Sequence, residues 1–472
     1  MITIYKLSIM WAHYPKLLFL TSLFFLCTES HSKAQDVQNA PELFNTYKEV
    51  ASKIIQAADS DQHAYKRLTY LCDTFGNRPS GSKRLEKAID WALETMMHDK
   101  LDNVHGEPVR VPHWERGYES AVLLSPRRTQ LTLIGLGGSI PTPPEGITSE
   151  VIVVKSLQQL AQYKDKISDK IVLINEPFTT YGETITTRTH GAIEAAKYGA
   201  KACLIRSVTD FSLGNPHTGI MYYDPKVTKI PAAALSLEDA EMLQRMQDRG
   251  QKIQVKLLLS NKRYPNSISR NVIADIKGYE KPDEVVIVSG HLDSWDVGQG
   301  AVDDAGGAMI AWEAIRLLKQ LGLRPRRTIR AILWTCEEWG GYGGRQYVKD
   351  HKNQLGNHIL AIESDGGVFS PIGFSFSGNK EAYKVIRQAA QLLNPIGADN
   401  IIHGGGGEDI SYMMQEDVPG MGLRVRGGRY FWYHHSVGDT IDKLNKNDID
   451  KCLAAFTVMA YVIADMPDNL PR

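Results

Sequence analysis

The stretch "EVVIVSGHLDSWDVGQGAVDDAGGAMIAWEAIRLLKQLG", Glu284–Gly322, decides the fold class, because it reads as a strand, a polar loop and a helix in succession. Its first residues, "EVVIVSG", form the apolar run expected of a strand covered on both faces. Its last part, Ala308–Gly322, has apolar residues at helical spacing. The same order of strand, loop and helix recurs toward the C-terminus. This predicts an α/β fold with a mostly parallel, twisted sheet flanked by helices.

The loop in the middle of this stretch is unusually acidic. Between Val288 and Gly307 it holds one histidine and four aspartates, but no lysine or arginine. Aspartate is unfavourable in a buried strand and in a helix interior. Either these carboxylates face water, or a cation that is not an amino acid lies among them.

Other predicted strands end in residues of the same kind. The strand "TIRAILWTCEE" ends at Glu337 and Glu338, and "HILAIESDGG" ends at Asp365. Because the carboxyl ends of parallel strands meet at one edge of a sheet, these carboxylates would repel one another unless divalent cations lay between them. Histidine and carboxylate ligands without a thiolate suit zinc or a related first-row metal. A later aromatic run, "YFWYHHSVGDT", adds two histidines and an aspartate: His434, His435 and Asp439.

Each of these residues also has an ordinary structural interpretation. His291 and Asp293 could form a hydrogen-bonded surface pair, and Asp303 could be an acid at a helix N-terminus. The glutamate pair could be a solvated loop, and the two histidines could stack within the aromatic run. The recurrence of such residues at successive predicted strand ends favours a metal site instead.

Composition limits the class of protein. The 472 residues predict two or three domains, and a hydrophobic content of 43% is sufficient for sizeable cores. Lysine and arginine together equal aspartate and glutamate, at 54 each. Such a balance does not indicate a polyanion-binding surface, and we therefore expect no nucleic-acid partner.

The N-terminus predicts export. Lys16 precedes an apolar run of eleven residues, Leu17–Cys27, which is too short to span a bilayer but fits a signal peptide covering residues 1–34. A buried N-terminal helix is the alternative. We expect a secreted, extracellular or periplasmic protein with no membrane association after signal removal. The four remaining cysteines lie in scattered apolar runs and are predicted to be buried free thiols, although up to two disulfides are possible: Cys72, Cys203, Cys336 and Cys452.

The pattern of predicted helices and strands changes twice along the chain after the predicted signal peptide. Residues 35–119 are mostly helical in pattern and form the first part of a catalytic domain. Residues 120–270 alternate short β-branched runs with helical pieces, which predicts an inserted α/β domain with its own core. Residues 271–472 show the repeated order of strand, loop and helix seen in Glu284–Gly322, and they carry the predicted metal site.

The motifs "GHLDSW", "GAVDDAGG", "CEEWGG", "ESDGG" and "HHSVGDT", in this order, resemble the di-zinc aminopeptidase and glutamate carboxypeptidase group of exopeptidases. The inserted segment, with "DKIVLI" and "GAKACLIRS", is similar to the protease-associated domain that some members carry. The resemblance covers nearly the whole mature chain. It implies two Zn²⁺ ions per chain, a small peptide as substrate and a homodimer.

The resemblance also implies a role for each motif residue. Asp293 would orient His291, and Asp439 would act in the same way near His435. The residue before the ligand histidine varies in this group; here it is His434, which could hydrogen-bond the substrate or the developing oxyanion. The implied metal ligands and base are His291 and Asp365 for one zinc, Glu338 and His435 for the other, Asp303 as the bridge between them, and Glu337 as the general base.

The implied reaction is hydrolysis of peptide bonds in short peptides, above all unblocked dipeptides, by metal-activated water. The alternatives are an aminopeptidase acting on longer peptides, a non-catalytic binding relative of the same fold, and a zinc acyltransferase that uses one metal. An exopeptidase must also bind a charged terminus. Glu408 or Asp409 could receive an ammonium group. A cluster of three arginines could receive a carboxylate: Arg424, Arg426 and Arg429.

Overall fold

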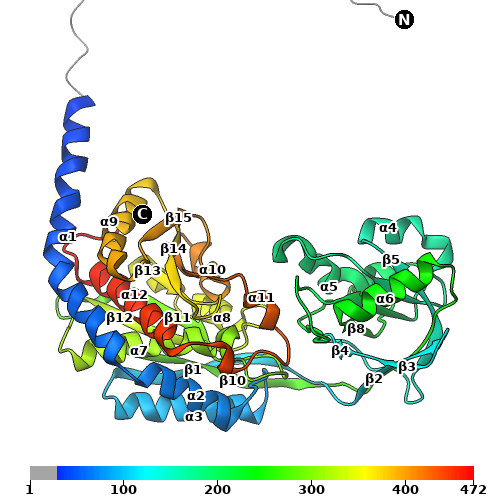
Figure 1. The fold of residues 1–472 in the computed structure, drawn as a ribbon. Helices are drawn as coiled ribbons and strands as arrows, with labels where there is room; N and C mark the ends of the chain where they lie inside the picture. Colours follow the sequence, from blue (N-terminus) through cyan, green and yellow to red (C-terminus); the bar gives the residue numbers. More distant parts are fainter. Residues whose placement is uncertain (1–28) are drawn as a thin grey trace, which may run out of the picture.

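The computed structural model describes the backbone from residue 29 to the C-terminus and the side chains from residue 43 onward. The predicted signal peptide, residues 1–34, therefore lies almost entirely outside the described residues. In that described part, no helix is both long and apolar enough to cross a membrane. The chain forms two sheets that lie side by side, each with its own helices (Figure 1).

The first sheet has a parallel centre. Strands β12, β11, β13 and β16 pair in parallel, whereas β1, β10 and β14 are joined to their neighbours toward the centre by antiparallel pairing. The fold-class prediction is thus confirmed, with antiparallel additions at the flanks. In spatial order the strands are β1 (Asp102–Glu115), β10 (Lys262–Ile276), β12 (Arg327–Trp334), β11 (Lys281–His291), β13 (His358–Glu363), β16 (Gly420–Val425), β14 (Pro371–Ser377) and β15 (Asn400–His403).

Helices cover both faces of this sheet (Figure 1). Val286 and Val288 of β11 share one hydrophobic core with α7 (Gly306–Gln320) and α12 (Lys446–Asp465). The residue between them, Ile287, packs on the opposite face with α8 and α10, as the alternation of side chains along a strand requires. The other helices around the sheet are α1 (Glu29–Ser60), α2 (His63–Phe75), α3 (Lys83–His98), α8 (Tyr342–Asp350), α9 (Lys380–Ala390), α10 (Glu408–Met414) and α11 (Tyr430–Tyr433).

The second sheet extends from Glu119 to Leu259 and lies between β1 and β10 in the chain. Its helices are α4 (Leu157–Gln162), α5 (Tyr181–Ala196) and α6 (Leu237–Asp248), and we call this unit the second part. The limits predicted for the inserted domain remain a prediction. The strands, in spatial order, are β3 (Thr129–Leu131), β2 (Glu119–Ser125), β9 (Gln254–Leu259), β5 (Ile147–Val154), β6 (Ile171–Ile174), β7 (Ala202–Arg206), β8 (Ala232–Leu235) and β4 (Leu133–Gly135).

Short helical turns complete the chain, and one of them carries the acidic loop of the decisive stretch. Ala301–Ala305 forms a single irregular turn directly before α7. The other short turns are Lys164–Lys166, Lys352–Asn357, Gln391–Ile396 and Ile441–Lys443. The prediction for the cysteines is confirmed, because all four described cysteines are buried and unpaired.

A cluster of two histidines and one glutamate fastens the end of α8 to β1. Glu107 Oε1 lies 2.8 Å from His351 Nε2 and 3.4 Å from His105 Nε2. The hydrogen bond to Glu107 is the main cause that raises the pKa of each histidine. Burial raises the pKa of Glu107, but the two histidines outweigh it and lower this pKa to about 2.

We expect Glu107→Gln to lower the free energy of unfolding in a pH-dependent way. The stabilisation from the two histidines is fully present below their ordinary pKa of 6.5 and is lost as the pH rises through their raised folded-state pKa. The stabilisation from Glu107 is present above its ordinary pKa of 4.5 and is lost as the pH falls toward 2. The loss in the variant, about 1 kcal/mol and mostly through the less exposed His351, should be greatest between these two ordinary pKa values. Urea unfolding at pH 5.5 and pH 9 measures it, and equal losses at both would contradict the expectation.

Candidate metal centre

The parallel centre of the first sheet brings the predicted residues to one edge. Strands β12, β11 and β13 are parallel neighbours, so their carboxyl ends lie next to one another. His291 is the last residue of β11, Glu337 follows β12, and Asp365 follows β13. Asp303 lies in the irregular turn before α7. Segments that are distant in the sequence thus bring histidine and carboxylate groups to one edge of the sheet.

Two groups of possible ligand atoms share one aspartate. In the first group, His291 Nε2 lies 3.1 Å from Asp303 Oδ1 and 3.5 Å from Asp365 Oδ1. In the second, His435 Nε2 lies 3.4 Å from Asp303 Oδ2 and 2.9 Å from Glu338 Oε2. The two oxygens of Asp303 thus face different groups, which is the arrangement that a carboxylate bridging two cations requires.

The residues of these groups fit a metal ion. Asp303 Oδ2 and Asp365 Oδ1 are buried and have no hydrogen-bond partner, and a buried carboxylate oxygen without a partner is costly unless a cation lies beside it. Among the described residues, the ion-pair partners of both aspartates within 4 Å are histidines. Imidazole nitrogens and carboxylate oxygens, with no thiolate, are a donor set that suits zinc.

The electrostatics of the centre show the same excess of negative charge. Burial, with the neighbouring carboxylates, raises the pKa of Glu337 and of Glu338 well above the ordinary value. Burial also raises the pKa of Asp303, but the hydrogen bond from His291 and the charge of His435 outweigh it and lower this pKa. Cations held among these groups would favour the ionised form of every carboxylate.

Asp293 links a predicted ligand to the predicted base. The ring Nδ1–H of His291 donates to the backbone carbonyl of Asp293 at 3.0 Å, which leaves Nε2 free to face Asp303. The carboxylate of Asp293 accepts a hydrogen bond from the backbone N–H of Glu337 at 3.1 Å. Asp293 therefore contacts the ring of His291 through its backbone carbonyl, whereas its carboxylate holds the start of the Glu337 loop.

Asp439 does not contact His435, where the sequence resemblance had put it. Its Oδ1 accepts hydrogen bonds from the backbone N–H groups of Ala301 and Val302, at 2.8 and 2.7 Å. Its Oδ2 accepts one from the backbone N–H of Asp303, at 3.2 Å. The carboxylate thus acts as a cap on the turn before α7 and fixes the position of Asp303. The reason is that the chain turns back after His435 and passes over this turn.

The two adjacent histidines lie face to face, with ring centroids 3.5 Å apart. The Nδ1–H of His435 donates to the backbone carbonyl of Thr218, at 3.2 Å, so that Nε2 faces Glu338. His434 Nε2 lies 3.6 Å from Asp303 Oδ2, and its Nδ1 is buried without a partner. His434 is therefore closer to the possible ligand atoms than the sequence indicated, and it forms a group with Asp303 and His435.

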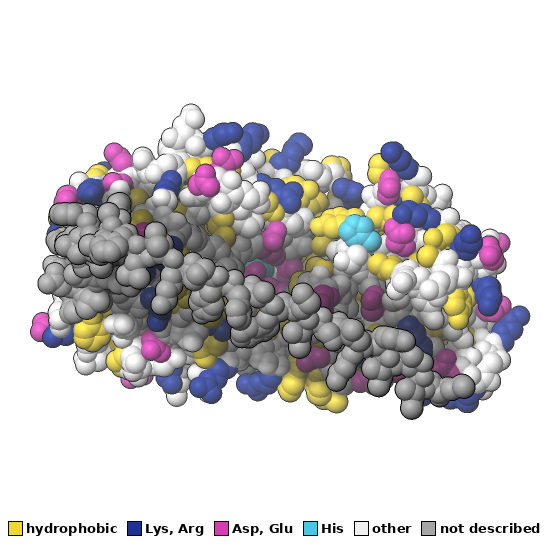
Figure 2. Space-filling model, turned by 90° about the horizontal axis from the view of Figure 1, so that it is seen from above, with side chains coloured by type: hydrophobic (Ala, Val, Ile, Leu, Met, Phe, Trp, Pro, Cys, Tyr) yellow, Lys and Arg dark blue, Asp and Glu magenta, His cyan; other side chains and the backbone are white. Residues whose placement is uncertain are grey.

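A cavity of about 390 Å³ opens above these residues, between the two parts of the chain. Seen from above, acidic side chains gather in the middle of this face, between the two parts (Figure 2). One wall comes from the first sheet and includes Glu337, Glu408 and Tyr430. The other wall comes from the second part and includes Tyr181 and Arg188. The second part thus completes the site.

Arg188 is the functional candidate that the sequence analysis missed. It is only 3% exposed, and one of its terminal nitrogens donates to the backbone carbonyl of Thr218 at 3.3 Å and lies 3.2 Å from His435 Nδ1. The other donates to the hydroxyl of Tyr181 at 2.8 Å, while Nε is buried and has no partner. A signal was present: among Lys, Arg, Asp and Glu, Arg188 is the sole member between Glu183 and Glu194. A single charged residue in an otherwise uncharged stretch of a helix indicates a specific hydrogen-bond or ion-pair partner.

Some predicted terminus-binding residues lie elsewhere. Arg426 is exposed and does not line the cavity, because β16 ends at Val425 and the chain then leaves the sheet in a solvated loop. Arg424 donates to Asn400 instead. Asp409 is completely buried, with no hydrogen-bond partner for either side-chain oxygen, and is likewise absent from the lining. Glu408 does line the cavity.

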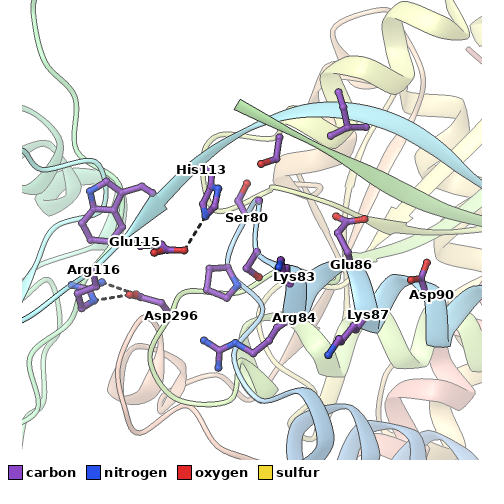
Figure 3. Close-up of a pocket in the computed structure, with 16 residues that line it drawn as sticks. Ser80, Lys83, Arg84, Glu86, Lys87, Asp90, His113, Glu115, Arg116 and Asp296 are labelled. Atoms are coloured by element: carbon purple, nitrogen blue, oxygen red, sulfur yellow. Dashed lines mark hydrogen bonds and ion pairs between the residues drawn. The ribbon is translucent and has the colours of Figure 1, made fainter. Parts of the chain in front are cut away.

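A roomier cavity, of about 960 Å³, lies beside the start of α3 (Figure 3). Its lining mixes Lys83, Arg84 and Lys87 with acidic groups, and none of the metal-ligand candidates belongs to it. Figure 3 also shows Arg116 paired with Asp296, at 2.7 and 2.8 Å, an ion pair that ties the chain entering the second part to the loop of the decisive stretch. This cavity is therefore a junction between the two parts and not the chemical centre.

Comparisons with known proteins agree with this geometry. Residues 271–460 match the sequence pattern of Peptidase family M28. Carboxypeptidase Q from Xenopus laevis is 48% identical over 95% of this chain and 97% of its own length. The human carboxypeptidase Q is 48% identical over 90% of each chain. The resemblance noted from the motifs, which points to carboxypeptidase Q within its group, is thereby confirmed.

Solved structures support the same assignment. A crystal structure of a peptidase M28 precursor from Shewanella amazonensis superposes with a TM-score of 0.87, at 35% identity, over 91% of this chain and 99% of that one. A zinc aminopeptidase from Bacillus subtilis shares the fold, with a TM-score of 0.65 at 22% identity, over 86% of this chain and 96% of that one. The prediction that the chain is a peptidase is confirmed by this kinship. The chain belongs to peptidase family M28, among the carboxypeptidase Q enzymes.

Proposed function

We propose that this chain is a di-zinc metallo-exopeptidase that hydrolyses unblocked dipeptides. The observation that carries the proposal is the position of Asp303, whose two oxygens face two separate groups of histidine and carboxylate ligand atoms. Glu337 lies beside them, with its Oε2 3.9 Å from His291 Nε2. Two-metal hydrolases use a carboxylate that bridges the two ions, with a second, unbound carboxylate beside it as the base.

The zinc assignment is supported by the donor set and by the family. His291 and Asp365 would hold one ion, Glu338 and His435 the other, and Asp303 both. When bound, zinc supplies a Lewis acid that polarises the scissile carbonyl and lowers the pKa of bound water, so that a hydroxide nucleophile is available near neutral pH. The Bacillus subtilis relative of the same fold is described as a zinc aminopeptidase.

The chain's own residues would then move the proton. Glu337 would take a proton from the attacking water and deliver it to the leaving amine. Its backbone N–H is held by the Asp293 carboxylate, whose carbonyl also holds the ring of His291. Asp293 therefore fixes the distance between base and ligand, a precondition for efficient transfer. Tyr430 and Asp303 line the same cavity, and the Tyr430 hydroxyl would help to orient that bridging carboxylate.

The charges around the cavity favour a substrate with two free ends. Arg188 lines the cavity beside His435 and has an unpartnered Nε, so it would donate paired hydrogen bonds to a substrate carboxylate. Glu408 lines it beside Gly340, and the hydroxyl of Tyr412 bonds to both residues. We propose that Glu408 receives the amino terminus. A cavity of about 390 Å³ with a charged anchor for each terminus favours a short peptide.

Three further features of the proposal come from the sequence. The apolar run Leu17–Cys27 supports export by a signal peptide, hence a secreted or periplasmic enzyme. The resemblance to the exopeptidase group supports a homodimer. It also supports a protease-associated domain, predicted over residues 120–270, inserted in the catalytic domain; the position of the second part between β1 and β10 agrees with an insertion.

The proposal is tested with four substrates: a free dipeptide, its N-acetyl form, its C-terminal amide and a pentapeptide. We expect wild-type enzyme to cleave the free dipeptide fastest. Arg188→Gln should raise KM for the free dipeptide about 10–100-fold, because a buried charge-assisted hydrogen bond is lost. The same change should have little effect on the amide, which lacks the carboxylate. Arg426→Gln, an arginine that does not line the cavity, is the matched control and should behave as wild type.

Each departure from this pattern has a definite meaning. Cleavage of the pentapeptide as fast as the dipeptide would refute the two-ended cavity and favour an aminopeptidase acting on longer peptides. Equal losses on free and amidated dipeptides in Arg188→Gln would show that Arg188 supports the metal site and does not bind the carboxylate.

A further inference from the structure

A third hollow, a cleft of about 510 Å³, adjoins the metal cavity on the side of the Trp339 loop. Its walls are aromatic and include Trp114, Tyr222 and Trp339. Three cationic side chains stand around it: Lys229, Arg263 and Arg345. We call it the aromatic–cationic cleft.

The aromatic–cationic cleft shares wall residues with the metal cavity. Ile220 and Tyr222, both from the second part, line the two hollows at once. On the other side, Trp339 lines the cleft and directly follows Glu338 of the metal centre. The cleft therefore lies next to the metal cavity, with Tyr222 between the two.

The charge of the cleft is opposite to that of the metal cavity. No aspartate or glutamate is among the described residues that line it. Within the described part of the chain, no ion pair within 4 Å joins Lys229, Arg263 or Arg345 to a carboxylate, although the charge of Glu408 acts on Arg345. Lys229 lies over the ring of Tyr223, and Arg345 over that of Tyr412. Three cations without a carboxylate partner around one hollow make it complementary to an anion.

The cleft lies at the end of the cavity where Glu408 is found. The Arg345 guanidinium is 4.9 Å from the ring centroid of Tyr412, and the hydroxyl of Tyr412 donates to Glu408 at 3.0 Å. Since Glu408 is the group assigned to the amino terminus of the substrate, the nearest substrate side chain is that of the N-terminal residue. The aromatic walls suit its methylene groups, and the cations suit an acidic group at its tip.

We propose that the aromatic–cationic cleft is the subsite for the N-terminal side chain of the substrate and selects an acidic one. The inference rests on the proposed dipeptidase function and adds to it the substrate class. Dipeptides that begin with glutamate or aspartate are then better substrates than those that begin with the neutral amides. The selectivity is electrostatic and acts across a solvated cleft, so it weakens as salt concentration rises.

The test compares hydrolysis of Glu-Leu with that of Gln-Leu, two dipeptides that differ only in the side-chain charge of the first residue. We expect wild-type enzyme to show a kcat/KM about tenfold higher for Glu-Leu at low salt, since each of three exposed charge pairs adds a small favourable amount. The double variant Lys229→Gln/Arg263→Gln leaves one of the three cations and should lower the ratio to about twofold, through the Glu-Leu value alone. An unchanged value for Gln-Leu shows that the variant is folded and active.

The matched control is Lys226→Gln/Lys262→Gln. Lys226 lies on the same loop as Lys229 but does not line the cleft, and Lys262 precedes Arg263 on β10, where successive side chains point to opposite faces. The control should keep the tenfold ratio. Equal rates for the two dipeptides in wild type, or a ratio that survives in Lys229→Gln/Arg263→Gln, would overturn the inference while leaving the proposed function intact. If wild type hydrolyses neither dipeptide, the proposed function fails and the subsite assignment falls with it.

Discussion

Glu337→Gln is expected to lower turnover at least ~10²-fold while the zinc content stays unchanged. The amide keeps the shape of the side chain and its place beside His291, but it cannot accept a proton from water. The expected ligands, among them Glu338 and Asp365, remain in place, so the metal should remain bound. Steady-state kinetics on a free dipeptide, together with elemental analysis of the same preparation, measures both quantities.

A control separates the loss of the base from a general effect of removing a charge. Glu416 is an exposed glutamate after α10 and is not part of the cavity. Glu416→Gln should retain wild-type turnover. Near-normal activity of pure Glu337→Gln would refute the base assignment, whereas loss of zinc along with activity would make Glu337 a ligand.

His435→Ala should remove a metal ion, while His434→Ala should keep both ions and lose turnover. His435 presents Nε2 to Glu338 at 2.9 Å, and its other ring nitrogen donates to the carbonyl of Thr218. Removing a ligand of this kind should weaken zinc binding by more than the ~10–100-fold that loss of an outer hydrogen-bond partner costs. His434 has one nitrogen 3.6 Å from Asp303 Oδ2, where it can contact a substrate oxygen.

The pair of variants is its own matched control, because the two imidazoles are stacked neighbours of equal size. Zinc per chain after dialysis against a weak chelator is the measurement, with a thermal melt to establish that each variant is folded. If His434→Ala strips a metal and His435→Ala does not, the ligand assignment is wrong by one residue.

The strands and helices near the metal centre could be predicted because local patterns determine them. The apolar run of β11 and the helical spacing of α7 can be recognised without knowledge of what they pack against. The alternating order of such strands and helices then predicts parallel pairing. Short polar motifs after each strand then predicted which residues meet. The antiparallel pairing of β1 with β10 was not predicted, because their register links residues more than a hundred positions apart.

The parts of the site that depend on the meeting of the two sheets escaped prediction. Arg188 belongs to the second part and reaches the metal centre only because that part folds back over the cavity. Asp439 has backbone partners, which no side-chain motif encodes. The exposure of Arg426 and the burial of Asp409 depend on where β16 and α10 end, and helix and strand limits are the least predictable feature of a sequence.

Thr218 holds His435 by both of its backbone groups: its carbonyl accepts from the ring at 3.2 Å, and its N–H donates to the His435 carbonyl at 2.9 Å. If Thr218 and His435 moved apart by about 1 Å, both hydrogen bonds would exceed bonding distance. Opening the cavity for a bulky chain and holding His435 in place are therefore competing demands. Under the proposed function, a peptide too large for the cavity would have to displace a metal-ligand residue in order to enter, so its exclusion would cost metal binding as well as steric strain.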